Sequence, residues 1–395
     1  MKPRRQGRHV CSTRLWPRKR LFSCCRHYGI SKRCPRVALL VFVDYYSAQP
    51  CLGRGGKMMK AVGYRKCLPI GDEESLFDFE TEKPHARGHD ILVKVQAISV
   101  NPVDTKVRSR REAVDDVPVI LGWDAVGEVV EVGEAVTAFS PGDEVWYAGD
   151  YMRPGTNAEF HLVDERIVAL KPQSVSAAAA AALPLTALTA YEMLFDRLQV
   201  NTPVLGNAPA ILIIGGAGGV GSIAIQLLCA LTDITIVATA SRPETKAWVT
   251  ELGAHHVIDH NQPLDSQVAD LGIGSINFVF STNQSDRYIE QIAALITPQG
   301  RFGLIDDPEI FAIKPLKAKS ISLHWELMYT RSLFQTPDMD RQGQILTEVA
   351  GLLDAGKIRS TATQTIGPVS AENLKIAHAQ LETNTTLGKL VLEGF

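Results

Sequence analysis

The second half of the chain alternates between short apolar runs and longer amphipathic stretches. Residues 210–214 are apolar throughout, residues 215–221 are rich in glycine, and residues 222–231 continue as an apolar helical stretch. The pattern predicts further strands at 234–240, 256–258, 276–280, 301–305 and 320–324, with helices such as 244–252 and 286–295 between most of them. Six strands joined by helical crossovers predict an α/β fold with a doubly wound parallel sheet.

The region from residue 60 to about 169 has a different pattern, in which glycine and proline turns separate short strands. We expect these strands at 91–97, 125–132, 144–147, 158–162 and 167–170. Short strands of this kind predict a compact β-barrel rather than a parallel sheet. The alanine-rich residues 177–195 should be helical on either side of Pro184.

The C-terminal part of the chain contains a predicted helix at 341–355 and a short apolar strand at 390–392. We expect this tail to rejoin the barrel, so that the parallel-sheet domain is inserted into the barrel domain. The predicted segments are an N-terminal extension (1–58), the first part of the barrel domain (59–182), the parallel-sheet domain (183–322) and the returning part of the barrel domain (323–395).

The glycine-rich segment has the spacing of a dinucleotide-binding turn. Gly216 permits a tight turn, Gly218 lets a pyrophosphate approach the backbone, and Gly221 lets the following helix pack closely on the strand. The N-terminus of that helix presents free N–H groups to the phosphates. We predict that the cofactor contacts the turn and the carboxyl ends of the fourth and fifth strands, at Gly216, Gly218, Gly219, Val220, Gly221, Ser281 and Ile305.

The residues after the second predicted strand of this sheet indicate which dinucleotide is bound. An acid about twenty residues beyond the glycines would bind the ribose hydroxyls and favour NAD. This chain has Ser241 and Arg242 there, with Lys246 one helical turn further on. A hydroxyl, a guanidinium and an ammonium suit a 2′-phosphate, so we predict NADP(H). In the alternative interpretation, Arg242 and Lys246 are only the solvated start of a helix.

Composition is typical of a globular protein with a large core, since 45% of the 395 residues are hydrophobic and 21% are charged. We expect no apolar run of membrane-spanning length, because the longest candidate, 37–43, is far too short. The expected protein is cytoplasmic and binds neither a membrane nor nucleic acid.

The net charge of −2 hides a strong asymmetry between the N-terminus and the rest of the chain. Residues 1–57 contain fourteen Lys and Arg, one acid and five of the seven cysteines, and the remainder carries 27 basic and 42 acidic residues. This leader could be a basic arm for nucleic acid or a membrane surface, a targeting sequence, or a stretch upstream of the native protein. We favour the last, because Met58 and Met59 open a strand-like pattern, and expect the extension to be disordered or non-native.

Three further motifs accompany the glycine turn, in the same order along the chain. They are Ser-Val-Asn-Pro-Val-Asp at 99–104, Leu-Gly-Trp-Asp-Ala-Val-Gly at 121–127 and Leu-Thr-Ala-Leu-Thr-Ala-Tyr at 185–191. Together they resemble the medium-chain dehydrogenase/reductase superfamily, specifically its zinc-free quinone oxidoreductase branch, often labelled zinc-type alcohol dehydrogenase-like. The resemblance implies a GroES-like barrel domain, a Rossmann domain, a cleft between them and a homodimer.

The resemblance also bears on metal binding. Zinc members of the superfamily use a cysteine, a histidine and a second cysteine as ligands, and the matching positions here are Asn101, Trp123 and about Leu185. An amide, an indole and an alkyl chain cannot assemble a zinc site. Only Cys67 and Cys229 lie outside the leader. We therefore predict no metal.

Without a metal to polarise a carbonyl, hydride transfer is most feasible to acceptors that are already activated, such as quinones and α,β-unsaturated carbonyls. The protein must align the acceptor and supply hydrogen-bond donors to the developing oxyanion. Tyr64 is a candidate phenol donor, with a packing role as the alternative. Asn101 is a candidate contact for substrate or the nicotinamide ribose, and Thr186 for the nicotinamide carboxamide.

The sequence thus predicts an NADPH-dependent reductase of small quinones or enones that needs no zinc. Two alternatives remain open at this point. One is an alcohol or aldehyde dehydrogenase, and the other is a non-enzymatic regulatory protein that binds NADPH.

Overall fold

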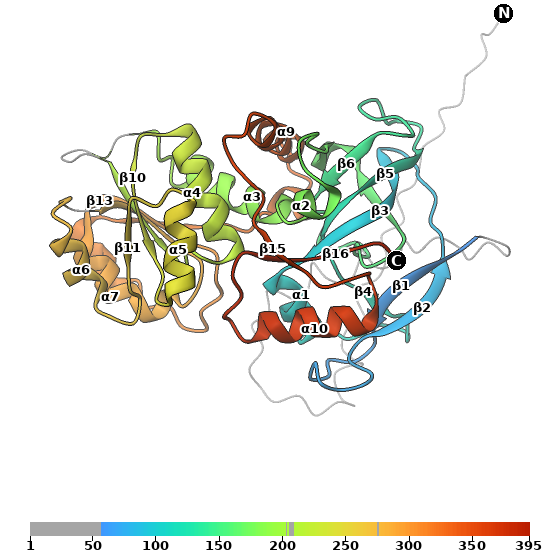
Figure 1. Cartoon of the computed structure of the whole chain (residues 1–395), viewed down its shortest axis with the longest axis horizontal. Helices are drawn as coiled ribbons and strands as arrows, with labels where there is room; N and C mark the ends of the chain where they lie inside the picture. The colour runs from blue at the N-terminus through green and yellow to red at the C-terminus, as the bar shows by residue number, and fades with distance from the viewer. Residues whose placement is uncertain (1–56, 203, 205–208, 275) are drawn as a thin grey trace, which may run out of the picture. The chain divides into compact units, whose positions relative to one another are not determined.

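The computed structural model describes residues 57–202, 204, 209–274 and 276–395 (Figure 1). The interpretation of the basic leader, including its expected disorder, lies outside these residues. The described chain contains one antiparallel-rich sheet system and one parallel sheet, which are linked by the helical residues 177–197 and by the C-terminal segment.

The first sheet system is organised around β3 (Asp90–Val100), which pairs with strands along both of its edges. Most of its side chains are buried, and those of Ile91, Val93 and Ile98 lie in the main hydrophobic core. Its antiparallel partners are β5 (Asp124–Val132), β7 (Phe160–Asp164) and β16 (Lys389–Glu393). Beyond β5 the sheet continues through β6 (Glu144–Tyr147) and β8 (Val168–Leu170).

A smaller sheet contains two strands that the sequence pattern did not predict. β1 (Met58–Tyr64) pairs antiparallel with β2 (Phe77–Glu82) and with β4 (Val119–Ile120). β2 is half exposed and rich in acids, and β4 has only two residues. Neither strand carries a strong hydrophobic signal of its own, so both depend on β1 as the partner that completes their backbone hydrogen bonds.

The C-terminal tail lies within the barrel sheet (Figure 1). Residues 390–393 pair antiparallel with residues 97–100 of β3, and β15 (Ala362–Thr365) pairs parallel with β16. The tail also contributes helices α9 (Arg341–Asp354) and α10 (Ala371–Glu382). The strand expected at 390–392 is therefore present, together with a helix, α10, and a strand, β15, that were not predicted.

The second sheet has six parallel strands in the order β11-β10-β9-β12-β13-β14. Their bounds are β9 (Ala210–Ile214), β10 (Thr235–Thr239), β11 (His256–Ile258), β12 (Ile276–Ser281), β13 (Ile296–Leu304) and β14 (Ser322–Trp325). Numbered along the chain this is the 3-2-1-4-5-6 order of a Rossmann sheet. The predicted α/β fold is confirmed, although β13 begins five residues earlier than the pattern indicated.

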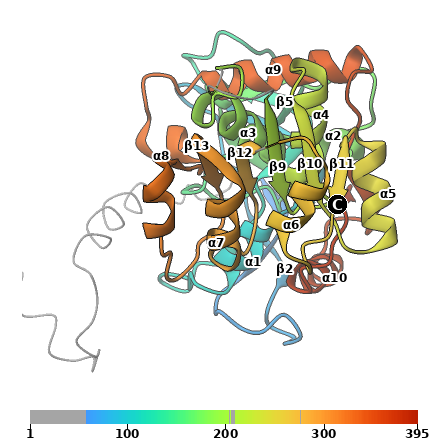
Figure 2. The same cartoon turned by 90° about the vertical axis from the view of Figure 1, so that its left-hand side faces the viewer.

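Helices cover both faces of this sheet (Figure 2). Ile211 and Ile213 of β9 pack into the core that contains α3 (Pro184–Tyr191) and α4 (Gly219–Leu231). Leu212 and Ile214 pack into a second core with α6 (Leu264–Asp270) and α7 (Ser285–Leu295). Burial on both faces explains why a parallel strand reads as a continuous apolar run rather than as an alternation.

The alanine-rich segment forms α2 (Ala177–Ala181), then α3, then a π-helical turn η3 (Glu192–Arg197). Pro184 is the first residue of α3, where its missing N–H costs nothing. Ala177–Arg197 is long and apolar enough to pass a test for a membrane span, which corrects the expectation that no such run exists. However, 83% of that window is buried inside the folded chain, as in the core helix of a globular protein.

Candidate active site

The carboxyl ends of β9 and β12 meet where the strand order of the parallel sheet reverses, which is the usual ligand position in such sheets. Gly215 follows β9 with φ of +82°, and a Cβ there would lie 2.2 Å from Thr282 Oγ1. Its N–H donates to Thr239 Oγ1 at the end of β10, at 3.0 Å. The turn is thus tied to both neighbouring strands.

The glycine turn has the shape that its predicted roles require. A Cβ on Gly221 would lie 2.3 Å from Gly215 O and 2.7 Å from Gly216 Cα, so the start of α4 packs directly on the turn. A Cβ on Gly218 would meet nothing closer than Gly215 O at 3.6 Å. Gly218 therefore leaves open backbone at the N-terminus of α4, and Val220 is only half buried.

The three residues predicted to select the cofactor lie at and after the end of β10. Arg242 caps α5 (Pro243–Glu251), donates to Thr385 O at 2.8 Å and pairs with Glu244 at 2.7 Å. Ser241 is half buried, and Lys246 is exposed on α5. The guanidinium is held in place from the C-terminal segment while remaining 39% exposed.

Ser281 and Ile305 lie side by side at the carboxyl ends of β12 and β13, where the Ile305 N–H donates to Ser281 O at 3.3 Å. Ser281 is fully buried, and its hydroxyl lies 2.8 Å from Ser285 Oγ. Ile305 is half buried. The predicted role of Ser281 is therefore restricted, because its hydroxyl is already hydrogen-bonded within the protein.

The C-terminal segment docks on the glycine turn. The N–H of Gly388 donates to Ala217 O at 2.9 Å, and Gly388 forms an isolated parallel bridge with Gly218. A Cβ on Gly219 would lie 2.7 Å from Lys389 Cδ and 3.1 Å from Thr186 Cγ2. The start of α4, the first turn of α3 and the start of β16 therefore meet at this turn.

Lys389 extends from there into a buried polar network of the barrel. Its ammonium donates to Val100 O at 3.0 Å, to Asp124 Oδ2 at 3.2 Å and to Asn101 Oδ1. The Asn101 amide donates to the same Asp124 oxygen at 2.7 Å, and Asp124 Oδ1 accepts the N–H of Leu185 at 2.7 Å. Burial lowers the pKa of Lys389, and the charge of Asp124 opposes that shift.

Asn101 is therefore a positioning residue in this structure, since both ends of its amide are used by Lys389 and Asp124. Asp104 caps the same turn by accepting the Asn101 N–H at 2.7 Å, at the start of α1 (Pro102–Arg108). Burial raises the pKa of Asp104 to about 7.

The residues at the positions of zinc ligands do not fit a metal. The oxygen of Asn101 accepts from an ammonium, the Trp123 indole N–H donates to Asp150 O at 3.1 Å, and Leu185 has no donor atom. Within the described ranges, no group of three or more His, Cys, Asp and Glu side chains could hold a metal ion. Zinc requires thiolate, imidazole or carboxylate ligands in a tetrahedron, which these residues do not supply.

Tyr64 occupies a structural position. Its side chain is fully buried, and its hydroxyl lies 2.7 Å from Arg111 O and 3.2 Å from Val107 O. It thus joins the end of β1 to one carbonyl in the last turn of α1 and to a second one just beyond that helix. The structure favours the packing alternative for Tyr64 over the expected contact with an acceptor.

Thr186 lies on the first turn of α3 with its hydroxyl donating to Leu183 O at 3.0 Å. Its methyl group faces Gly219 of the coenzyme turn. The hydroxyl proton is used, so only the oxygen lone pairs remain for a carboxamide N–H. This placement is compatible with the predicted contact and restricts it to an acceptor role.

An aromatic cluster lies next to this network, and the sequence analysis singled out neither of its two tyrosines. The rings of Trp123 and Tyr151 stack 5.7 Å apart at 17°, and Tyr329 lies 5.9 Å from Trp123 and 5.4 Å from Tyr151. Tyr329 is the residue before α8 (Thr330–Phe334), in the segment that leads from β14 back to the barrel. No local pattern distinguishes it, because its position depends on contacts more than 170 residues distant along the chain.

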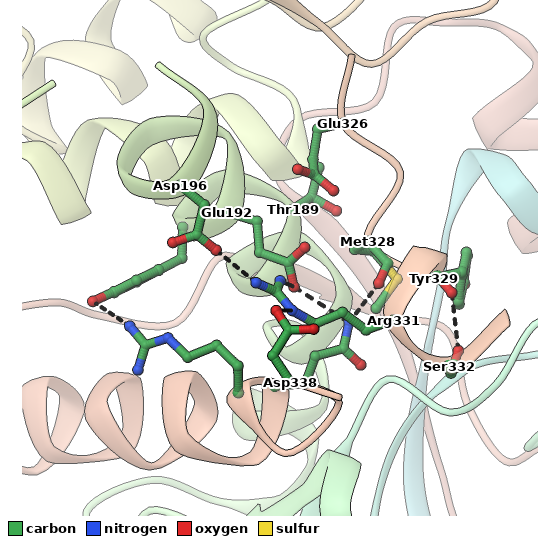
Figure 3. Close-up of polar contacts among 12 residues, drawn as sticks. Thr189, Glu192, Asp196, Glu326, Met328, Tyr329, Arg331, Ser332 and Asp338 are labelled. Carbon is green, nitrogen blue, oxygen red and sulfur yellow. Dashed lines mark hydrogen bonds and ion pairs between the residues drawn. The ribbon is translucent and has the colours of Figure 1, made fainter. Parts of the chain in front are cut away.

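A second polar cluster lies between η3 and α8 (Figure 3). Arg331 pairs with Glu192 at 2.7 Å, Asp196 at 2.9 Å and Asp338 at 3.0 Å. Burial and the neighbouring charge of Glu326 raise the pKa of Glu192 to about 8, so the Glu192 carboxyl group favours its protonated form at neutral pH. Figure 3 shows Tyr329 directed away from this cluster.

Comparison with known proteins shows which family this chain is similar to. The profile of the alcohol dehydrogenase GroES-like domain matches residues 87–173, and that of the zinc-binding dehydrogenases matches residues 252–392. A zinc-type alcohol dehydrogenase-like protein of Staphylococcus aureus is 41% identical over 340 residues, covering 85% of this chain and 99% of its own length. The 2-methylene-furan-3-one reductase of Solanum lycopersicum is 28% identical over 319 residues, covering 78% and 73%.

Solved structures give the same result. A Rhizobium etli protein, named for the zinc-dependent alcohol dehydrogenases, is 58% identical with a TM-score of 0.85 over 86% of this chain and 99% of its own. The quinone oxidoreductase of Coxiella burnetii is 27% identical with a TM-score of 0.70 over 86% and 100%. Fold and site thus define an oxidoreductase with a GroES-like barrel and a Rossmann sheet. The chain belongs to the medium-chain dehydrogenase/reductase superfamily, as its motifs predicted.

Proposed function

We propose that this oxidoreductase uses NADPH to reduce small quinones or α,β-unsaturated carbonyls without a metal. The observation that carries the proposal is the buried ammonium of Lys389 on Asn101 and Asp124, at a position where a zinc enzyme needs metal ligands. Relatives named as a 2-methylene-furan-3-one reductase and a quinone oxidoreductase support this acceptor class.

The residues present fit a phosphorylated dinucleotide. The backbone at Gly218 and the N-terminus of α4 would hold the pyrophosphate, and Arg242 and Lys246 would hold a 2′-phosphate. When bound, the nicotinamide ring supplies a hydride. The protein's part is to orient the ring and acceptor and to exclude water. Thr186, beside Gly219, lies where it could accept a carboxamide N–H.

The metal-free chemistry follows from the donor set. Asn101, Trp123 and Leu185 supply no zinc ligand, so a carbonyl gains no Lewis-acid polarisation from them. A quinone or an enone needs less help, because the added charge spreads over a ring or an enolate. A simple alcohol or ketone lacks this advantage.

The second candidate is reversible alcohol oxidation, which the names of the Staphylococcus aureus and Rhizobium etli relatives favour. One experiment separates the two proposals. The purified chain is treated with a chelator and assayed with quinones, enones and alcohols, using NADPH and NADH for reduction and NADP⁺ and NAD⁺ for oxidation. Retained NADPH-dependent reduction supports the first proposal. Alcohol oxidation that is lost on chelation and restored by zinc supports the second and contradicts the first.

We also propose that two copies of the chain associate through β14. This strand pairs only with β13 among the described strands. Its last residue, Trp325, is 51% exposed, and Leu327, two residues beyond it, is 53% exposed. An unpaired edge with exposed apolar side chains is a template for a second copy. Sedimentation of the purified chain should show a dimer, and Trp325→Lys should shift it to monomer. A wild-type monomer at high concentration contradicts the proposal.

A further inference from the structure

The hydroxyl of Tyr329 is a buried polar group that the fold leaves unsatisfied. Tyr329 is only 2% exposed, and its hydroxyl oxygen has no hydrogen-bond partner among the described residues. Buried tyrosine hydroxyls are usually hydrogen-bonded, because an unpaired one has lost its hydrogen bonds to water and has gained none from the protein. By contrast, the buried hydroxyls of Tyr64 and Tyr147 both have partners, at 2.7 Å and 3.0 Å.

The surroundings of Tyr329 place it at the candidate active site. Its ring packs 5.9 Å from Trp123, which directly precedes Asp124, and Asp124 bonds to Lys389 and Leu185. Lys389 in turn contacts the glycine turn at Gly219. Through Trp123, Asp124 and Lys389, the ring of Tyr329 is therefore connected to the coenzyme turn.

The protonation state of this hydroxyl suits a hydrogen-bond donor. Burial, together with the negative charges of Asp104, Asp124 and Asp150, raises the pKa of Tyr329 well above its usual value. The group therefore remains a neutral phenol at working pH, with its proton available. A carboxylate in the same place could accept a hydrogen bond but could not donate one.

We propose that the Tyr329 hydroxyl donates the hydrogen bond that stabilises the oxyanion of a planar α,β-unsaturated carbonyl bound against Trp123. The inference rests on the proposed function and specifies its acceptor. The acceptor gains a hydride at its β-carbon, the C=C electron pair moves to form an enolate, and the charge settles on the carbonyl oxygen. Tyr329 donates to that oxygen and keeps its proton, and a solvent proton then adds at the α-carbon to give the saturated carbonyl.

In this proposal, the acceptor reaches the Tyr329 hydroxyl by way of Tyr151. It is the one member of the aromatic cluster that is partly exposed, and it lies on the loop between β6 and β7. The Tyr151 ring stacks almost parallel on Trp123. The guanidinium of Arg111 lies 4.7 Å from the centroid of the Tyr151 ring. In the proposed complex, a flat conjugated acceptor takes the place of this ring on Trp123 with the same stacking geometry.

The test compares Tyr329→Phe with a matched control, Tyr288→Phe. Tyr288 is 3% exposed and lies on α7 in the other core. Loss of one oxyanion donor should lower kcat/KM for an enone by about 100-fold in Tyr329→Phe, with the KM for NADPH unchanged. Tyr288→Phe should retain wild-type kinetics.

A binding measurement gives a readout that does not need turnover. We would titrate full-length protein with 4-nitrophenolate, an anion that resembles the enolate, above the pKa of the free phenol. Tyr329→Phe should bind it about tenfold more weakly than wild type or Tyr288→Phe. Because the removed hydroxyl has no partner, the variant should also unfold at the same denaturant concentration or a higher one.

The outcomes separate this inference from the proposed function. If the wild type reduces enones with NADPH and Tyr329→Phe matches it in both kcat/KM and anion binding, the inference is wrong and the proposed function stands. A variant that is destabilised and loses activity for every acceptor alike indicates a structural tyrosine and also overturns the inference. If the wild type reduces neither enones nor quinones, the proposed function itself fails.

Discussion

The ammonium of Lys389 lies 3.2 Å from Asp124 Oδ2, and both side chains are almost completely buried. Lys389 begins the last strand of the barrel, and Asp124 begins β5, 265 residues earlier. The same lysine contacts the coenzyme turn through its methylene chain. This ion pair therefore connects the buried polar network of the barrel, around Asn101 and Asp124, with the nucleotide-binding turn.

Lys389→Met should destabilise the protein by about 3–5 kcal/mol, because it leaves the carboxylate of Asp124 buried without its cation. Urea unfolding monitored by tryptophan fluorescence measures the change. The double variant with Asp124→Asn should recover part of the loss, since the remaining buried charge is removed. A fully additive double variant contradicts a direct coupling of the two groups.

Arg242→Ala should raise the KM for NADPH about tenfold, through loss of a charged hydrogen bond to the 2′-phosphate. The KM for NADH should be nearly unchanged, because NADH carries no phosphate there. Arg287→Ala, a substitution of another arginine at the surface of the same sheet domain, is the control and should affect neither coenzyme. Equal losses for NADPH and NADH in Arg242→Ala would refute the assignment of NADP specificity.

Two glycines of the turn should respond in opposite ways to the same substitution. Gly221→Ala should lower stability by about 3 kcal/mol, because its Cβ would overlap backbone atoms at 2.3 Å and 2.7 Å. Gly218→Ala has room for its methyl group and should keep the wild-type Tm, while weakening NADPH binding at least tenfold, a cost of about 1.4 kcal/mol. Thermal unfolding and NADPH fluorescence titration measure the two effects. Unchanged NADPH affinity in Gly218→Ala contradicts the placement of the pyrophosphate.

Glu192→Gln should change how stability depends on pH. The pKa of Glu192 is raised to about 8 from its usual 4.5, so the folded chain binds a proton in this window that the unfolded chain does not. This stabilisation is fully present below pH 4.5 and is lost as pH rises towards 8, by up to about 1.4 kcal/mol per pH unit. Denaturant unfolding across this range should give a shallower decline for Glu192→Gln. An identical slope in both proteins would show that Glu192 titrates normally.

The sequence was sufficient for the parallel sheet, because the features that define it are local. Residues 210–231 contain a run that is apolar on both faces, a glycine turn and a helix, and these follow one another directly along the chain. The same locality made the chemistry of Asn101, Trp123 and Leu185 readable as a set without zinc ligands once their family positions were known. The strands β2 and β4 were missed because their short, half-exposed sequences have meaning only beside β1.

Side-chain roles in the site depended on tertiary contacts. Tyr64 and Tyr329 are both buried tyrosines, and nothing in their neighbouring residues indicates that one hydroxyl is bound to carbonyls near α1 while the other has no described partner. Lys389 precedes a short apolar strand and has no local signal of a role, yet its ammonium joins Asn101 and Asp124. The sequence by itself determined the fold and the cofactor turn, since hydrophobic period and glycine spacing act over a few residues. Only the tertiary structure decided which polar groups are paired, because burial and hydrogen bonding depend on residues brought together from distant parts of the chain.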